Sequence, residues 1–385
     1  MKPRNKLSVS VVMPCLNEEK GVGECVKTAL RVMKKNKIKG EVIVVDNSSS
    51  DNSAAVAIKA GARMVRENRK GYGSAYLAGL KKARGEVFII GDCDGTYDFN
   101  QIPDFIKKIE AGYDFVNGSR IKGQVAPGAF RFSHRFIAVP LLTGILNIFF
   151  KTSFSDAHCG MRAFSREAYK TMSLRCRGME FASEMIMKAA STNLKTTEIP
   201  IRYLPRIGES KLMRFRDAWR HIRFMLLFAP TYLFIIPGII LLVFGLSSLF
   251  LMLPGPFWLF GHGFDIHAMI LVSALAILGM NILTLGLFAK IFALYGDIEL
   301  VKNPLIKLFI DNFDQEDWLK LGLLFFLAGL GVSFYVFWLW VKANFGAIFQ
   351  IRAVILAITL MILGAQVIFA SFFASLMIDR HRELI

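Results

Sequence analysis

Two aspartates, one residue apart, follow an apolar run of the chain. Asp92 and Asp94 come directly after Val87 to Gly91, a run typical of a buried strand. Magnesium is usually held by one or two carboxylates together with substrate phosphate oxygens. Open α/β sheets bind their ligands at the carboxyl ends of the strands. Because turn aspartates are also common without a metal, the neighbouring segments have to decide the interpretation.

Three further segments place polar groups where strands end or helices begin. The turn Pro14 to Glu19 follows the first apolar run and offers backbone N–H groups and short carboxylates to a base, a ribose or a phosphate. Asp46 ends the second run. The glycines of Lys70 to Ala75 precede a helix and would let the backbone approach a diphosphate at the helix N-terminus. In this order, and ending in Asp92 and Asp94, these segments indicate a nucleotide diphosphate site.

Strand and helix patterns alternate through the first two hundred residues, which predicts βαβ units and a mostly parallel α/β sheet. The expected strands are Val9 to Met13, Glu41 to Val45, Arg63 to Arg66, Val87 to Ile90, Phe115 to Val116 and Thr196 to Leu204. The expected helices are Val22 to Lys35, Ser53 to Ala60, Ser74 to Ala83, Gln101 to Ala111, Phe130 to Phe150 and Glu180 to Ala190.

The second half of the chain is strongly apolar. With 385 residues, 54% hydrophobic content and a mean hydropathy of +0.44, the chain is too apolar for one soluble domain. Each of four stretches exceeds the ~20 residues that cross a bilayer: Leu226 to Leu253, Ala268 to Leu294, Leu319 to Val341 and Ala353 to Met377. The net charge of +17 therefore favours an anionic membrane surface over nucleic acid. No signal peptide is expected, and five scattered cysteines indicate free thiols in a reducing compartment.

Basic residues predict the orientation in the membrane. Many arginines precede the first stretch, whereas Pro254 to His267 has no Lys or Arg, which predicts a cytoplasmic soluble domain; Lys342 and Arg352 run against this rule. Leu212 to Met225 has the pattern of an amphipathic helix in the membrane interface, or alternatively of one packed on the soluble domain. The expected organisation is a soluble domain over residues 1–211, the interface helix 212–225, four spans within 226–378 and a cytoplasmic tail 379–385.

Residues 8 to about 211 resemble a family 2 glycosyltransferase of the GT-A fold, with most likeness to dolichyl-phosphate mannose and polyprenyl-phosphate glucose synthases. The matching segments are Pro14-x-x-Asn17-Glu18-Glu19, Val44 to Asp51, Gly71-Tyr72-Gly73, Asp92-Cys93-Asp94-Gly95, Asn117 to Arg120 and Arg206 to Lys211. The resemblance implies a nucleotide sugar donor bound by Pro14, Asn17, Glu18, Asp46, Asp51, Gly71, Asp92 and Cys93, with Mg²⁺ or Mn²⁺ on Asp92 and Asp94. Many relatives have a Gln that contacts the metal where this chain has Thr96, so a third protein ligand is left open.

The expected acceptor is a polyprenyl or dolichyl phosphate. With a second pKa near ~6, such a phosphate is a nucleophile at neutral pH and needs orienting cations, not a strong base. The candidate cations are Arg120, Arg131, Arg135, Arg206 and Lys211, although Arg131 and Arg135 fit anionic lipid equally well. Asp94, Arg120 and Lys211 are the expected catalytic residues, and Asp156 to Arg162, with Asp156 and Gly160, resembles the acceptor loop. Glu180 and Glu184 would position the sugar or form a salt bridge.

Two other functions stay open. A processive polysaccharide synthase needs a Gln-x-x-Arg-Trp motif, which this sequence lacks. A transporter or anchor with an inactive domain is disfavoured because the apolar stretches carry few ionisable residues, Lys290 and Lys320 lying near their ends. The sequence does not choose between UDP-glucose, UDP-N-acetylhexosamine and GDP-mannose, nor between dolichyl and undecaprenyl acceptors. A homo-oligomer is possible, without a motif that specifies it.

Overall fold

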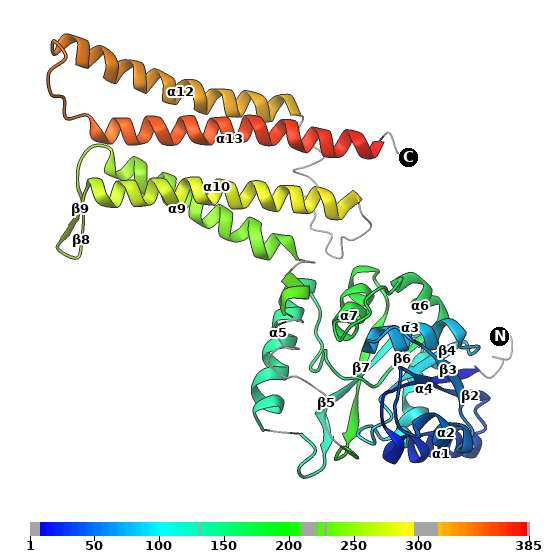
Figure 1. Ribbon diagram of the computed structural model, residues 1–385. Helices are drawn as coiled ribbons and strands as arrows, with labels where there is room; N and C mark the ends of the chain where they lie inside the picture. Colours follow the sequence, from blue (N-terminus) through cyan, green and yellow to red (C-terminus); the bar gives the residue numbers. More distant parts are fainter. Residues whose placement is uncertain are drawn as a thin grey trace. The chain divides into compact units, whose positions relative to one another are not determined.

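The computed structural model describes residues 8–130, 132–208, 219, 222–226, 229–295 and 315–382. The chain divides into two compact units, Met1–Met225 and Leu226–Ile385 (Figure 1). The predicted phosphate ligands Arg131 and Lys211 lie outside the described residues, as does most of the predicted interface helix Leu212 to Met225.

The first unit is built on a seven-stranded sheet with the order β3-β2-β1-β4-β6-β5-β7. The strands are β1 Val9–Cys15, β2 Gly40–Asp46, β3 Arg63–Arg66, β4 Val87–Ile90, β5 Phe115–Val125, β6 Arg162–Ser165 and β7 Thr196–Tyr203. Every neighbouring pair is parallel except those of β6, which runs antiparallel to both β4 and β5. The predicted mostly parallel α/β sheet of the GT-A fold is confirmed, and the carboxyl ends of β1, β2 and β4 meet at one edge.

Helices cover the sheet (Figure 1). They are α1 Glu19–Lys35, α2 Ser53–Lys59, α3 Tyr72–Lys82, α4 Ile102–Glu110, α5 Val139–Phe150, α6 Arg166–Met172 and α7 Phe181–Ser191, with the π-helical turn η2 His134–Ala138 ahead of α5. Successive residues such as Val11 and Val12 are fully buried although they point to opposite faces, because both faces of the sheet are covered.

Two elements differ from the sequence prediction. Strand β5 continues to Val125, so Arg120 lies inside the strand and not after its end. Strand β6 and helix α6 were not predicted, because β6 is four residues long and begins with an arginine. Arg162 is nevertheless almost completely buried, since carbonyl oxygens surround its guanidinium. The charged Arg162 is therefore the reason that the sequence does not predict β6, which lies between β4 and β5 in the sheet.

Within the described part of the second unit, four helices are long and apolar enough to cross a membrane, over Thr231–Met252, Ile266–Ile291, Gln315–Lys342 and Ile351–Ile378. They belong to η3 Thr231–Ile235 with α9 Ile236–Met252, α10 Ile266–Tyr295, α12 Gln315–Lys342 and α13 Ile351–Arg382. A short hairpin, β8 Phe257–Leu259 and β9 His262–Phe264, joins α9 to α10. The number of predicted spans is confirmed, with boundaries shifted by a few residues.

Glycines allow close packing between these helices. A Cβ on Gly245 of α9 would meet the backbone of Ala276 in α10, and one on Gly329 of α12 would meet the backbone of α13. Lys342 and Arg352, which run against the rule that basic residues lie on the cytoplasmic side, both interact with other side chains. Arg352 forms an ion pair with Asp265, and the ammonium of Lys342 lies 3.6 Å from the ring centroid of Trp338.

Candidate functional site

The turns that follow β1 and β2 interlock at the carboxyl edge of the sheet. Asn17 has φ 51° and accepts a hydrogen bond from the Ser50 amide at 2.7 Å, while its own amide donates to the Ser49 hydroxyl at 3.0 Å. Asp46 accepts from the Ser49 amide at 2.9 Å. These bonds fix the shape of the turn that the sequence predicts for the nucleotide.

Asp51 connects the same two turns. One of its oxygens accepts from the amide and hydroxyl of Ser53, at 3.0 and 2.5 Å, and the other accepts from the Glu19 amide at 3.2 Å. Cys93 acts similarly further along the edge, where its buried thiol donates to the Pro14 carbonyl at 3.1 Å. Both residues hold the backbone around the predicted nucleotide site.

Asp92 and Asp94 follow β4 at this edge in different surroundings. Tyr76 of α3 donates to the partly buried Asp92 at 3.2 Å, and the buried Asp94 accepts from the amide and hydroxyl of Thr96 at 3.0 and 2.5 Å. Burial and the adjacent Asp94 charge raise the pKa of Asp92 to about 7. Thr96, at the position where the sequence leaves a third metal ligand open, donates its hydroxyl hydrogen to Asp94.

Arg206 joins the acidic pair to the first turn. Its Nη1 forms an ion pair with Asp94, and its Nη2 forms one with Glu18. The segment that carries Arg206 is held in place by the Ile207 amide, which donates to the Asp94 carbonyl at 2.9 Å. Arg206 is predicted to bind an acceptor phosphate, and in the structure it pairs with Glu18 and with Asp94, a predicted metal ligand.

The glycines before α3 have neighbours other than the predicted diphosphate. Gly71 has φ 146°, and a Cβ there would collide with the carbonyl oxygen of Arg177; one on Gly73 would collide with the Cys176 carbonyl. The amides of Gly73 and Ser74 donate to carbonyls of residues 178 and 177, at 3.2 and 3.0 Å. The absence of a Cβ at these glycines therefore lets the backbone of residues 176–178 approach, and the predicted contact with a diphosphate stays a prediction.

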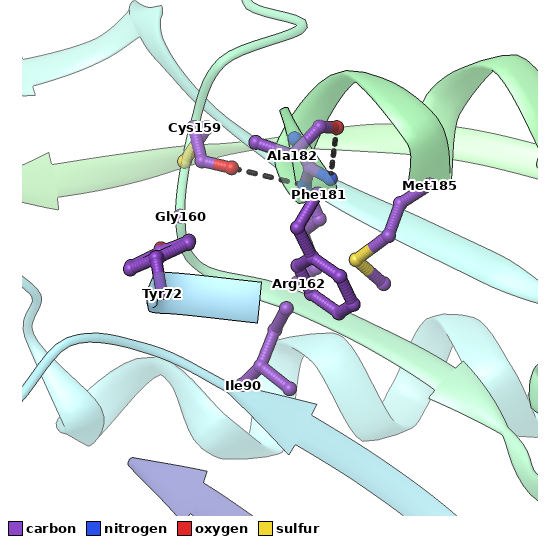
Figure 2. A pocket seen from close by; sticks show the side chains of 8 residues that line it. All are labelled: Tyr72, Ile90, Cys159, Gly160, Arg162, Phe181, Ala182 and Met185. Carbon is purple, nitrogen blue, oxygen red and sulfur yellow. Dashed lines mark hydrogen bonds between the residues drawn. The ribbon is translucent and has the colours of Figure 1, made fainter. Parts of the chain in front are cut away.

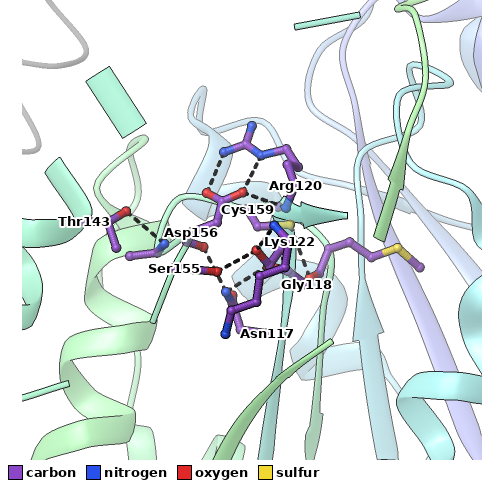
Figure 3. Close-up of polar contacts among 12 residues, drawn as sticks. Asn117, Gly118, Arg120, Lys122, Thr143, Ser155, Asp156 and Cys159 are labelled. Carbon is purple, nitrogen blue, oxygen red and sulfur yellow. Dashed lines mark hydrogen bonds and ion pairs between the residues drawn. The ribbon is translucent and has the colours of Figure 1, made fainter. Parts of the chain in front are cut away.

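Arg120 and Asp156, predicted for different parts of the acceptor site, form one buried pair (Figure 3). Nε and Nη2 of Arg120 donate to the two Asp156 oxygens at 2.7 and 2.8 Å, and the Arg120 amide donates at 3.0 Å. The Arg120 side chain is 10% exposed and its guanidinium lies over the rings of Phe130 and Tyr203. Two of the hydrogens of this guanidinium are therefore directed at Asp156.

Arg162 holds the predicted acceptor loop in place through hydrogen bonds to carbonyl oxygens of the loop. Its guanidinium donates to the carbonyls of Ala157, Cys159 and Ala182 at 2.7 to 2.9 Å. Figure 2 shows it beside Cys159 and Ala182 in a small pocket that Gly160 also lines. A Cβ on Gly160 would come close to Tyr97, Tyr72 and Asp92, so this loop lies against the acidic pair.

Several residues of the site were not predicted. Tyr97 accepts from the Gly160 amide at 2.7 Å, and Glu198 accepts from the amide and hydroxyl of Ser155. Glu198 is the third residue of β7. A carboxylate inside a predicted strand is the sequence signal that could have identified it as a candidate. Glu184, predicted for the sugar or a salt bridge, pairs with Lys188 at 3.4 Å and accepts from the amides of residues 175 and 176. Arg135 lies over the ring of Phe136 in η2.

The donor set fits a divalent cation. Two carboxylates lie next to each other, the pKa of Asp92 is raised partly by the charge of Asp94, and an arginine is already drawn to Asp94. Among the described residues, no group of three or more His, Cys, Asp or Glu side chains surrounds a single point. Two protein carboxylates with phosphate oxygens completing the shell is the arrangement that suits Mg²⁺.

Comparisons with known proteins show which family the chain resembles. A family model described as Glycosyl transferase family 2 matches residues 10–173, and one described as Glycosyltransferase family 2 C-terminal transmembrane region matches residues 287–378. The low-salt glycan biosynthesis hexosyltransferase Agl6 of Haloferax volcanii is 38% identical over 366 residues, which cover 95% of this chain and 88% of that protein. A dolichyl-phosphate hexose transferase of the same organism is 32% identical over 209 residues, covering 54% of this chain and 87% of that protein.

One solved structure with a similar fold is glucosyl-3-phosphoglycerate synthase from Mycobacterium tuberculosis in complex with Mn²⁺, UDP-glucose and phosphoglyceric acid. It is 19% identical and covers 57% of this chain and 79% of its own, with a TM-score of 0.47.

Proposed function

This chain belongs to glycosyltransferase family 2, and on that premise we propose that it transfers a hexose from a nucleotide diphosphate sugar to a polyprenyl or dolichyl phosphate, with inversion at the anomeric carbon. The observation that carries the proposal is the meeting of Glu18, Asp94 and Arg206 at the carboxyl edge of the sheet. That cluster offers carboxylates for a metal and a guanidinium for a diphosphate. Four apolar helices in the same chain favour a lipid acceptor.

The donor would bind across the edge formed by β1, β2 and β4. The base and ribose would lie on the turn containing Asn17 and on Asp46, whose shape is fixed by the hydrogen bonds between the two turns. Asp92 and Asp94 would hold Mg²⁺ or Mn²⁺, which when bound stabilises negative charge on the departing diphosphate. Arg206 would move from these carboxylates to the diphosphate, because its guanidinium can bind phosphate oxygens in a bidentate manner.

The acceptor phosphate would lie near Arg120 and the loop that contains Gly160. An oxygen of the lipid phosphate attacks the anomeric carbon, a new carbon–oxygen bond forms, and the bond to the diphosphate breaks with its electron pair leaving on the diphosphate. No strong base is needed, because the phosphate is already largely ionised near pH 7. Asp156 would set the direction in which Nη1 of Arg120 points.

The test is turnover by the full-length protein with labelled UDP-glucose, UDP-N-acetylhexosamine and GDP-mannose, each with a polyprenyl phosphate. Label in a mobile lipid product is expected with one donor, and it should disappear on chelation of the metal. Asp94→Asn should lower turnover by ~100-fold or more, on the scale of losing one charge-stabilising group. Asp104→Asn, which changes an exposed carboxylate of α4, is the matched control and should leave turnover unchanged.

Two results would contradict the proposal in different ways. Label that appears in polymer would indicate a processive synthase. Absence of label from both lipid and polymer with every donor, while the protein remains folded, would indicate an anchor whose glycosyltransferase domain is inactive.

A further inference from the structure

Helix α10 exposes a single row of side chains between its contacts with other helices of the second unit. It packs against both α9 and α13 (Figure 1). From residue 271 to residue 291, its exposed side chains follow one another at alternating spacings of three and four residues, which places them along one line of the helix. We call this row the α10 seam, and its members are Leu271, Ala274, Leu278, Asn281 and Leu285. The same spacing brings two helices into contact in a coiled coil.

Asn281 is the polar member of this seam. It lies near the middle of the apolar span Ile266–Ile291, at a depth where a bilayer contains no water. Its Oδ1 accepts a hydrogen bond from Nε2 of Gln366 in α13 at 3.0 Å. The described part of the chain offers no acceptor to the amide hydrogens of Asn281, although the side chain is exposed. Acyl chains cannot supply an acceptor, so these hydrogens need one from a neighbouring protein helix.

We propose that the α10 seam is the contact between two copies of this chain in the membrane, with Asn281 of one copy hydrogen-bonded to Asn281 of the other. All copies cross the bilayer in the same orientation, so a two-fold axis along the membrane normal brings each seam residue opposite its own counterpart. An Asn side chain carries two donors, and its Oδ1 has a second lone pair besides the one that Gln366 uses. Two Asn281 side chains can therefore pair, and the leucines of the seam pack on either side of them.

The chemistry of the seam favours a second copy over other occupants. An isoprenoid or acyl chain could cover the leucines, but it has no acceptor for the amide of Asn281. A different membrane protein would need a polar group of its own at the same depth. A second copy has that group at the same depth by symmetry, and no charged residue of the seam opposes the contact. One Asn in an otherwise apolar seam also fixes the register of the two helices.

The test is disulfide cross-linking of the purified full-length protein in liposomes, where a second copy is the only protein available. Cys176→Ser serves as the background, because the other four native cysteines are buried. A cysteine is introduced into the seam by Leu278→Cys or Leu285→Cys, whose native side chains are 48 and 56% exposed. The control is Leu327→Cys on α12, where the native side chain is 52% exposed. Copper phenanthroline and oxygen form the cross-links, and the yield of covalent dimer is measured at several protein-to-lipid ratios without donor or acceptor.

We expect the cysteines at 278 and 285 to cross-link several-fold more than the cysteine at 327, and this difference to persist when the protein is diluted with lipid. Equal yields at all three positions would indicate random collisions and would overturn the proposal. Absence of cross-links at both 278 and 285 would mean that lipid or another protein covers the seam, which also contradicts it. The two seam positions are independent, so a folding defect in one variant leaves the other as a test.

Two further substitutions separate the contact between copies from the bond inside one chain. Asn281→Leu removes both the bond to Gln366 and the proposed bond to the second copy, whereas Gln366→Leu removes only the first. Combined with Leu278→Cys, Asn281→Leu should lower the yield of covalent dimer several-fold, and Gln366→Leu should leave it unchanged. Equal losses in the two variants would assign the effect to the packing of α10 on α13. That result, or an unchanged yield with Asn281→Leu, would overturn the proposal.

Discussion

Arg206 and Asp94 are 112 residues apart in the sequence and form an ion pair at the carboxyl edge of the sheet. The same guanidinium pairs with Glu18 from the turn after β1. A cation of the protein thus pairs with Asp94, one of the two carboxylates that we propose for the metal. The proposed donor site therefore contains a positive charge that a bound metal and diphosphate would have to displace.

Arg206→Gln should strengthen metal binding in the absence of donor. Removal of the guanidinium leaves the charges of Asp94 and Glu18 without this partner, so Mn²⁺ affinity should rise by roughly tenfold, about 1.4 kcal/mol. Binding is measured from the electron paramagnetic resonance signal of free Mn²⁺. The same variant should raise the KM for the donor, because the diphosphate loses a ligand. Unchanged or weaker Mn²⁺ binding would show that Arg206 does not compete with the metal.

Metal affinity should depend on pH through Asp92. Burial and the neighbouring Asp94 charge raise its pKa to about 7, so the carboxyl group is protonated below that pH and a cation must displace a proton. Mn²⁺ affinity should therefore increase from pH 5.5 to 7.5, by up to about tenfold per unit below pH 7. Asp92→Asn should be weaker at every pH and lose most of this dependence. An affinity that is constant over this range in the wild-type protein would contradict the assignment.

Asp156→Asn should destabilise the first unit. The substitution leaves the buried Arg120 guanidinium without its charge partner, and breaking a buried pair typically costs about 3–5 kcal/mol. Thermal unfolding monitored by fluorescence should show a lower Tm. Lys107→Gln, which removes an exposed pair with Asp104, is the control and should cost no more than ~1 kcal/mol. A Tm equal to that of the wild type would mean that Arg120 finds another partner.

Gly329→Leu should separate α12 from α13. A Cβ at Gly329 would meet the Ala357 carbonyl and the Met361 backbone, so a leucine has to push the helices apart, at a cost of about 1–3 kcal/mol. Gly331 provides a close control, because a Cβ there meets nothing within 4 Å. Unfolding in detergent should occur at lower temperature for Gly329→Leu and not for Gly331→Leu. Similar behaviour of the two variants would exclude this packing as a source of stability.

The sequence by itself determined the features that depend on residues close to one another in the chain. Continuous apolar runs predicted strands such as Val87 to Ile90 at the observed residues, and long apolar stretches predicted four spans. Asp92 and Asp94 lie at the end of β4 for the same local reason, since a polar pair directly after a buried strand must lie at its carboxyl end. The family resemblance rests on such local segments in their order, and it also holds in the comparisons.

Only the tertiary structure decided which distant side chains meet. A long arginine side chain reaches several partners, so nothing in the sequence assigns Arg206 to Asp94 or Arg120 to Asp156. Likewise, the sequence does not indicate that a Cβ on Gly71 would collide with the carbonyl oxygen of Arg177, in a segment about a hundred residues later. Strand β6 stayed hidden because the desolvation of Arg162 is offset by carbonyl oxygens that only the folded chain brings together. Local pattern fixes where a side chain begins, and the packing of distant segments decides what its charged end contacts.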